Sequence, residues 1–257
     1  MDDTNDKQFA LTLARGLDIL RCFSIEKPYL SNRELADLTG LSKPTISRFT
    51  YTLIKLGYLE TDTVSGKFQL GTAVLSLGYP LLASMSMRQL ARPLLRELAE
   101  FSQGSASLGV RDRLSMVYVE TSRHHSVFNI RLSDVGLSYP ILSTAIGRAY
   151  LCGYPPAQRQ AILNELRVKE PDQWARFGEA TMQNIEAFHQ RGYCVSFGEI
   201  INDIHGIAVP LPASGRDRPM AINCVVHSYQ MSPEDIERKI GPRIVSVSRA
   251  LQARAGA

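Results

Sequence analysis

The chain has 257 residues, a formal net charge of +4 at pH 7 and 44% hydrophobic residues, which is enough apolar material for the packed cores of one or two domains. No apolar run approaches the length of a membrane span, and the N-terminal segment 1–6 is acidic and polar, unlike a secretory signal. These features argue against a transmembrane or secreted chain, and we expect a cytoplasmic protein without a membrane partner.

The first strong local signal is the segment Ser31-Asn32-Arg33-Glu34. It is a capping box, in which the Ser31 hydroxyl accepts from the amide of Glu34 and the Glu34 carboxylate accepts from the amide of Ser31. This box predicts the start of a short helix with Leu35 and Leu38 on one face. Gly40 supplies the left-handed residue that ends the helix and reverses the chain.

A second helix is predicted almost at once, with Ser42 as its cap and Pro44 in its first turn, where a missing amide proton costs nothing. Apolar residues at helical spacing predict its buried stripe, which consists of Ile46, Phe49, Leu53 and Leu56. The opposite face is polar and basic, and carries Lys43, Thr45, Ser47, Arg48, Tyr51, Thr52 and Lys55. Between Asp37 and Glu60 there are three basic residues and no acidic one, so a polyanion meets no like charge there.

Two short strands, 59–61 and 67–70, follow this helix and are joined by a loop that contains Ser65-Gly66. Helix, tight turn, helix and hairpin together predict a winged helix-turn-helix, whose second helix enters the major groove of DNA. Thr45, Ser47 and Arg48 are the candidates for base reading, and Lys67 is suited to a phosphate. The predicted DNA-binding residues are Ser31, Ser42, Lys43, Pro44, Thr45, Ser47, Arg48, Tyr51, Thr52, Lys55 and Lys67. The alternative is a small helical subdomain whose polar face is only solvated.

The segment 71–78 predicts a helix that is capped at Thr72 and broken near Gly78 and Pro80. A further helix carries an apolar stripe that indicates a core or dimer contact, formed by Met87, Leu90, Ala91, Leu94, Leu95 and Leu98. We therefore expect a winged helix-turn-helix domain at 1–71, a linker helix region at 72–87 and a second domain at 88–257.

Strands and helices alternate in the rest of the chain, which predicts an α+β domain. Strands are expected at 107–110 and 116–120, around a turn at Arg111-Asp112-Arg113, and at 127–131, 207–211 and 220–226, with a polar turn at Ser214-Gly215-Arg216 before the last. Helices are expected at 144–151, 156–165 and 181–190, and a terminal helical region at 232–254 is interrupted by Gly241-Pro242.

Several motifs follow one another in a fixed order along nearly the whole chain. At the N-terminal end they are LTLARGLDIL at 11–20, ELA at 34–36, SKPTISR at 42–48 and LGYL at 56–59. Further along they are LARP at 90–93, TAIGRA at 144–149, RGYC at 191–194, AVP at 208–210 and the strand that begins Ala221-Ile222. This ordered set resembles the IclR-type bacterial transcriptional regulators and, more loosely, the branch that controls aromatic-acid catabolism.

The resemblance implies a dimer or tetramer that binds a double-stranded operator, a linker that helps two chains pair, and a GAF- or PAS-like second domain that binds a small organic acid. It places effector contacts at Ala145, Ile146, Ser196, Ile204, Gly206, Asn223 and Val225. The residues at these positions fit an aromatic or medium-sized carboxylate, and an activator would also contact RNA polymerase. Apart from the resemblance, the helix start after Ser143-Thr144 offers free amides to an anion.

Each of four polar residues near this pocket has two possible roles. Arg148 either contacts the ligand or lies on the surface. Glu199 and Asp203 either bind a polar ligand or cap a turn. His205 either lines the cavity or has a structural role.

The cysteines are widely separated and include no Cys-x-x-Cys pair, so neither a zinc ribbon nor a disulfide framework is indicated. We expect buried apolar thiols, with a ligand-sensing or redox role for Cys224 as the alternative. His124-His125 is interpreted as a polar loop pair, and no spacing of histidines and cysteines predicts a zinc site. We therefore expect neither a metal nor a cofactor.

Two other functions stay open beside the effector-responsive regulator. The common nucleophile-elbow, Walker, dinucleotide and zinc-protease motifs do not occur in the sequence, so we expect no catalytic residues, although an enzyme of unrecognised type is the alternative. A third possibility is a DNA-binding protein whose second domain only oligomerises. An open or a filled cavity around Ala145, Asn223 and Val225 distinguishes that protein from a sensor.

Overall fold

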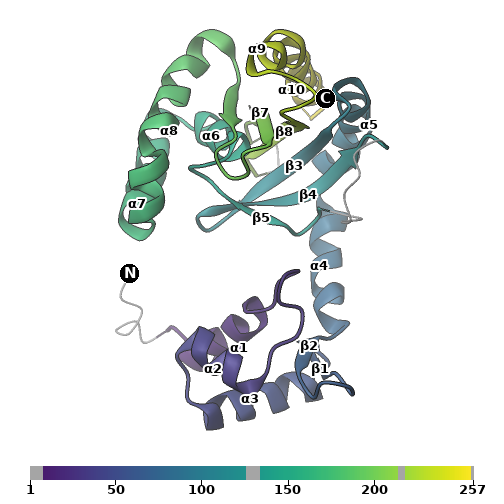
Figure 1. Cartoon of the computed structure of the whole chain (residues 1–257), viewed down its shortest axis with the longest axis vertical. Coiled ribbons are helices and arrows are strands. Elements are labelled where there is room, and N and C mark those ends of the chain that lie inside the picture. The colour runs from purple at the N-terminus through teal and green to yellow at the C-terminus, as the bar shows by residue number, and fades with distance from the viewer. Residues whose placement is uncertain (1–7, 126–133, 214–217, 256–257) are drawn as a thin grey trace. The chain divides into compact units, whose positions relative to one another are not determined.

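The computed structural model describes residues 8–125, 134–213 and 218–255, and Figure 1 shows the chain with its elements labelled. The chain divides into two compact units, an N-terminal unit at Met1–Ser84 and a C-terminal unit at Met85–Ala257. In the described part of the chain, no helix is both long and apolar enough to span a membrane.

The N-terminal unit is a winged helix-turn-helix. Its elements are α1 (Leu11–Arg21), α2 (Asn32–Thr39), α3 (Lys43–Lys55), β1 (Leu59–Thr61), β2 (Phe68–Leu70) and α4 (Ala73–Ser84). The predicted capping box opens α2: the Ser31 amide donates to Glu34 Oε2 at 2.7 Å and the Glu34 amide donates to Ser31 Oγ at 3.2 Å. Gly40 has φ 69°, the left-handed conformation that ends α2 and turns the chain into α3.

The core of the N-terminal unit brings together α1, α2, α3 and the wing. Its buried side chains are Ile19, Phe23, Leu30, Leu35, Ile46, Leu53 and Leu59. The prediction that Leu56 is buried is wrong, because its side chain is 60% exposed. Leu38, predicted to share a face of α2 with Leu35, is 50% exposed. Leu56 is the C-cap at the end of α3. Within the helix, Thr50 is buried although its hydroxyl group did not predict it.

Helix α4 continues through the residues at which a break is predicted. Pro80 lies inside the helix, and none of the helix's residues is buried. A proline removes one backbone hydrogen bond, and on a helix this exposed the freed carbonyl can bond to water instead. The chain leaves the helix only at Met85, the extended N-cap residue of α5.

The C-terminal unit is an α+β domain built on one antiparallel sheet. Its strands are β3 (Ser105–Asp112), β4 (Ser115–Arg123), β5 (Ser138–Pro140), β6 (Cys194–Phe197), β7 (Ile204–Leu211) and β8 (Met220–His227), in the order β5-β4-β3-β8-β7-β6. Its helices are α5 (Ser86–Ser102), α6 (Ala145–Cys152), α7 (Pro156–Lys169), α8 (Pro171–Arg191), α9 (Pro233–Asp235) and α10 (Gly241–Ala255). The predicted hairpin at 111–113 is confirmed, with Arg113 at φ 52° between β3 and β4.

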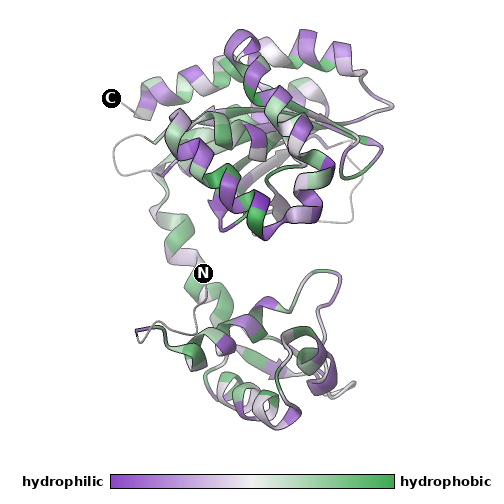
Figure 2. Cartoon of the chain, turned by 90° about the vertical axis from the view of Figure 1, so that its left-hand side faces the viewer, coloured by the Kyte–Doolittle hydropathy of each residue, from purple (hydrophilic) through white to green (hydrophobic). Residues whose placement is uncertain are grey.

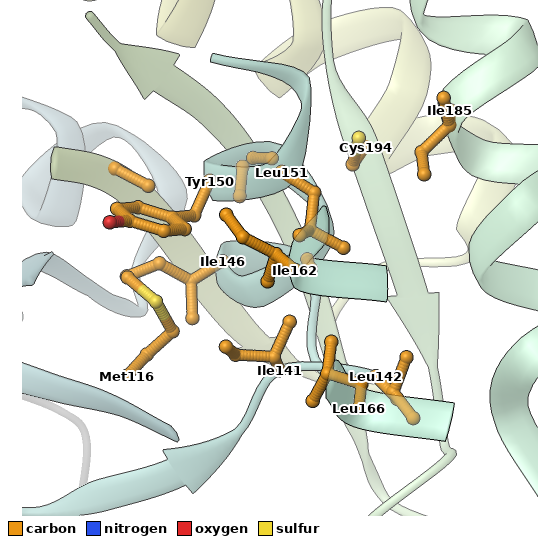
Figure 3. Close-up of a cluster of buried hydrophobic side chains, with 14 of the residues drawn as sticks. Met116, Ile141, Leu142, Ile146, Tyr150, Leu151, Ile162, Leu166, Ile185 and Cys194 are labelled. Atoms are coloured by element: carbon orange, nitrogen blue, oxygen red, sulfur yellow. The ribbon is translucent and has the colours of Figure 1, made fainter. Parts of the chain in front are cut away.

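Helices cover both faces of this sheet. Helices α5 and α10 pack on each other and on one face, while α6 packs on the other face and against α8. Side chains of β8 point alternately to these two faces of the sheet. Ala221 belongs to the core around α6, whereas the Cys224 thiol is hydrogen-bonded to Ser102 of α5. Figure 3 shows the α6 core, in which Ile146 and Leu151 meet side chains from β4, α7 and α8.

The terminal helical region is continuous where an interruption is predicted. Residues Ile236–Ile240 form a π-helical turn that runs directly into α10. Pro242 therefore lies in the first turn of α10, where its missing amide is tolerated. Strands β5 and β6 are additional to the predicted ones. The predicted strand at 127–131 and the predicted turn at 214–216 lie outside the described residues.

Candidate DNA-binding helix and effector cavity

Helix α3 is held by its inward face and presents its other face to solvent. Ser42 is its N-cap, Pro44 lies in its first turn, and Ile46, Thr50 and Leu53 are buried. The cations of α3, Lys43, Arg48 and Lys55, are exposed. Among the described residues no carboxylate forms an ion pair with any of the three, so their charges are available to a polyanion.

The hydroxyl groups predicted to bind DNA are already engaged in the structure. Ser47 Oγ donates to the carbonyl of Lys43 at 3.0 Å and accepts from Asn32 Nδ2 at 2.8 Å. Thr52 Oγ1 donates to the carbonyl of Arg48 at 3.0 Å, and Ser31 and Ser42 serve as helix caps. The Ser47 and Thr52 hydroxyls keep a lone pair, but their protons become available to DNA only when the side chains rotate. The caps Ser31 and Ser42 instead accept from the backbone amides of Glu34 and Thr45.

Lys67, the predicted phosphate contact of the wing, forms an ion pair with Glu34 at 3.2 Å. The Ser31 hydroxyl and amide, together with Lys67, lower the pKa of Glu34 to about 2. This pair joins the wing to the start of α2, so Lys67 also has a structural role that the sequence did not indicate. Tyr51 is exposed, and Lys55 Nζ lies 5.6 Å from the centre of its ring.

A cavity of about 320 Å³ lies between α6 and the sheet of the C-terminal unit. Six of the seven predicted effector contacts line it, namely Ala145, Ser196, Ile204, Gly206, Asn223 and Val225. The seventh, Ile146, is fully buried in the hydrophobic core. It follows Ala145 on α6, so its side chain points to a different side of the helix.

The sheet register explains why residues so far apart in sequence meet at this cavity. Ser105, Val225, Gly206 and Ser196 are neighbours on β3, β8, β7 and β6, and they form one row across four strands. Asn223 lies two residues before Val225 and therefore faces the same side of the sheet. The cavity floor is thus one face of the sheet.

Polar groups on this floor are only partly satisfied. Asn223 Nδ2 donates to the Tyr118 hydroxyl at 2.6 Å, whereas the buried Asn223 Oδ1 has no hydrogen-bond partner. Burial raises the pKa of the Tyr118 hydroxyl above its ordinary value, so the group keeps its proton at neutral pH. The floor therefore offers an unused acceptor beside a phenol that can still donate.

The opposite side of the cavity is suited to an anion. Thr144 caps α6 and accepts from the amide of Gly147 at 3.2 Å, while no acceptor within the described residues bonds the amides of Ala145 or Ile146. Arg123 also lines the cavity and is ion-paired with Asp134. A carboxylate placed at the start of α6 would meet free amides and the positive end of the helix dipole.

The sequence analysis missed several residues of the cavity wall: Ser105, Tyr118, Arg123, Asp134, Tyr139, Ile200 and Ile201. Most lie on β3, β4 and β5, at the far side of the sheet from β6. Residues 116–119 of β4 are all apolar or aromatic, so polarity along the strand does not show which face Tyr118 takes. Nothing in the local sequence indicates that β4 and β6 share a cavity.

Arg148 is fully buried and is neither a surface residue nor a cavity residue. Its guanidinium donates to the carbonyls of Leu142 at 2.9 Å and Val195 at 2.8 Å and forms an ion pair with Glu199. Glu199 therefore neither caps a turn nor faces the ligand. His205 is absent from the cavity wall, and its ring packs edge-on against Phe197 with the buried Nδ1 unpaired.

The cysteines are not all buried. Cys194 and Cys224 are buried, and Cys22 and Cys152 are half-buried. The Sγ atoms of Cys152 and Cys194 lie 3.6 Å apart. Hydrogen bonding to Cys194 lowers the pKa of the Cys152 thiol, and burial raises the pKa of Cys194. Two cysteines that are 42 positions apart thus form a thiol pair.

Comparison with known proteins identifies both units. Residues 12–63 match the IclR helix-turn-helix domain, and residues 80–253 match the bacterial transcriptional regulator IclR C-terminal family. The HTH-type transcriptional regulator TsaQ1/TsaQ2 of Comamonas testosteroni is 35% identical over 247 residues, which cover 94% of this chain and 87% of that protein.

Solved structures agree with this match. The crystal structure of an IclR family transcriptional regulator from Brucella abortus shares 36% identity, has a TM-score of 0.88 and covers 99% of this chain and 95% of that one. An IclR homologue from Microbacterium hydrocarbonoxydans, solved in complex with 4-hydroxybenzoate, shares 23% identity, with a TM-score of 0.67 and coverage of 93% of this chain and 99% of that one. These relatives are transcriptional regulators and not enzymes. The chain belongs to the IclR family of bacterial transcriptional regulators.

Proposed function

We propose that this regulator reads its operator with α3 and responds to an aromatic carboxylate that carries a hydroxyl group, bound in the α6 cavity. The observation that carries the ligand part is the buried Asn223 Oδ1, which has no hydrogen-bond partner at the cavity wall. An unsatisfied buried acceptor is costly, and a ligand hydroxyl would supply the missing donor.

The rest of the cavity is consistent with this ligand class. The volume of about 320 Å³ lies at the lower end of the range of about 300–1,000 Å³ that small-molecule sites occupy. Tyr139 and Val225 supply apolar wall for a ring, and the free amides at the start of α6 suit the carboxylate. The complex of the Microbacterium homologue with 4-hydroxybenzoate supports the same class of ligand.

The DNA part of the proposal is supported by the surface of α3. The exposed Lys43, Arg48 and Lys55 face no paired acid in the described residues, while Thr45 and Ser47 stand between them on the helix. Arg48 is the residue that we assign to base reading, and the flanking lysines to phosphates. Such a regulator works in the cytoplasm, where the operator is.

We also propose that two or four copies act together on the operator. Helix α4 exposes Leu75 and Tyr79 by 75% and 69%, and α1 exposes Leu13 by 63%. Figure 2 shows the apolar colour of α4. Exposed apolar helices of this kind indicate a partner surface, and a second copy suits an operator with two half-sites. If the protein activates transcription, RNA polymerase is a further partner.

Substitution of Asn223 tests the effector site. Asn223→Leu keeps the number and branching of the side-chain heavy atoms but removes the unused acceptor and fills more of the cavity, so 4-hydroxybenzoate should no longer raise the unfolding temperature, while operator binding stays intact. Thermal unfolding is measured with 4-hydroxybenzoate, with benzoate, which lacks the hydroxyl group, and with aliphatic acids.

The matched control is Cys224→Ala, because the Cys224 side chain lies on the other face of β8, against α5. This control should keep the full response to ligand. A shift that is equally large in Asn223→Leu and in the wild type would place the ligand elsewhere. A shift with aliphatic acids alone would reject the aromatic class.

A further inference from the structure

Three side chains that commonly bind metals gather on the C-terminal unit, and none of them lines the effector cavity. Glu100 lies in the last turns of α5, and His124 and His125 directly follow β4. One ligand atom from each of the three lies within 4.8 Å of the other two. The two imidazole rings are 4.0 Å apart, centre to centre.

The backbone holds two of the three ligands in fixed positions. The His124 amide donates to the carbonyl of Gly104 at 2.9 Å, in the turn between α5 and β3. Gly104 is itself in close contact with β8, since a Cβ at this position would lie 2.2 Å from the carbonyl oxygen of Val225. Because α5 packs on β3 and β4, the positions of Glu100 and His124 are set by the core of the unit.

The separation of the ligand atoms suits a small tetrahedral cation. Zn²⁺ binds imidazole nitrogens and carboxylate oxygens at about 2.0–2.2 Å, so two of its ligands lie roughly 3.4 Å apart. His124 Nε2 and Glu100 Oε2 are 3.4 Å apart. His125 is exposed, and its side chain can close the remaining distance by rotating.

The charge of Glu100 is available for a cation. Within the described ranges, the only ion pair of its carboxylate is with His124. By contrast, Glu120, which lines the same open groove as Glu100, is bound by Arg88 at 2.8 Å and by Arg92 at 3.0 Å. Arginine thus neutralises one acid of this groove and leaves the other beside two imidazoles.

We propose that Glu100, His124 and His125 bind one Zn²⁺, with a water molecule in the fourth position. A bound zinc ion would overturn the expectation from sequence that the protein has no metal. The sequence does not indicate this site, because the two adjacent histidines are 24 positions or more from the glutamate. The geometry does not depend on the effector cavity.

Zinc at this site would act on the end of β4. Arg123 precedes His124, lines the effector cavity and pairs with Asp134. A metal that ties His124 and His125 to α5 would hold the backbone of Arg123 and thus one wall of the cavity. This consequence rests on the proposed function, whereas zinc binding itself does not.

Isothermal titration of the metal-free full-length protein with ZnCl₂ tests the site. The protein carries Cys152→Ser and Cys194→Ser, because the paired thiols of these residues could also bind zinc. We expect one Zn²⁺ per chain. Glu100→Gln and His125→Asn should each weaken binding by roughly tenfold or more, and both residues are exposed, so the variants should fold.

His189→Asn is the matched control, since His189 is an exposed histidine on α8 outside the cluster. It should bind zinc like the parent protein. Co²⁺ provides a second measurement, because a four-coordinate site gives an intense visible absorption band that both cluster variants should lose.

The proposal is overturned if the parent protein binds no zinc, or if the cluster variants bind it as tightly as His189→Asn. Failure of the effector proposal has a different signature, because the response to 4-hydroxybenzoate is then lost while zinc binding persists.

Discussion

Arg148 is a fully buried charge that joins three separate segments of the C-terminal unit. Its guanidinium contacts the Leu142 carbonyl before α6, the Val195 carbonyl on β6 and the Glu199 carboxylate after β6. Ser196 beside it donates to the Ser143 carbonyl at 2.9 Å. These bonds fix the start of α6 against β6, and both elements line the cavity. Arg148 is therefore a positioning residue for the proposed effector site.

Replacing Arg148 should destabilise the C-terminal unit strongly. Arg148→Met removes one donor from each of the Leu142 and Val195 carbonyls, of which Leu142 keeps the Thr181 hydroxyl at 2.9 Å. It also leaves Glu199 without its partner, and removal of one member of a buried ion pair costs about 3–5 kcal/mol. Urea unfolding followed by the fluorescence of Trp174, the only tryptophan, measures this loss in the unit concerned. Arg249→Met, an exposed arginine on α10, is the control and should change the unfolding free energy little. If Arg148→Met lowers the free energy of unfolding no more than the control does, the buried ion pair is not needed for stability.

At the scale of elements, the capping box of α2 links the helix-turn-helix to its wing. The Ser31 hydroxyl and amide, with Lys67, hold the pKa of Glu34 at about 2, below its ordinary value of about 4.3. A lowered folded-state pKa means that this carboxylate stabilises the fold fully above about pH 4.3. The contribution is lost as the pH falls towards 2.

The protonation of Glu34 can be followed at the backbone amide of Ser31. The Ser31 amide donates to the Glu34 carboxylate, so its ¹⁵N chemical shift in an NMR titration should change with a midpoint near pH 2. The step should be absent in Glu34→Gln. A midpoint near pH 4.3 in the wild type would mean that the box does not hold the carboxylate.

The elements with strong local signals are those that the sequence predicted well. The capping box, Gly40 and Pro44 act within a few residues, so α2, the turn and α3 follow directly from the sequence. Strands β5 and β6 are short and depend on pairing with β4 and β7, which no local pattern contains. The helix break predicted at Pro80 is wrong because the effect of a proline depends on how exposed the helix is, which is a property of the folded unit.

In the candidate sites, too, some residues could be predicted from the sequence and others depend on the fold. Resemblance to the family indicated six residues of the cavity wall, whereas Tyr118 and Arg123 come from β4, and only the sheet order brings them to Asn223. The exposed cations of α3 could be predicted because helical spacing fixes a face. The ion pair of Lys67 with Glu34 could not, because it joins two segments 33 positions apart.

At the scale of the whole molecule, DNA reading and ligand sensing belong to different units of one chain. A ligand changes operator affinity only through its difference in affinity between two states of the protein. A coupling free energy of about 1–3 kcal/mol would change that affinity roughly 5- to 150-fold. Assembly of two or more copies would place two α3 helices on the two half-sites of one operator.

Operator affinity of an α3 variant is the most direct measurement of the central claim, which is that α3 reads DNA through Arg48. Selection from random duplexes with the wild-type protein supplies the operator, and fluorescence anisotropy then gives affinities at fixed salt for the wild type, Arg48→Ala and Arg249→Ala. One lost base contact costs about 1–3 kcal/mol, so Arg48→Ala should bind the operator at least about fivefold more weakly than the wild type. Arg249→Ala removes the same charge from the other unit and should bind like the wild type. Equal affinities of Arg48→Ala and Arg249→Ala for the selected operator would contradict the account.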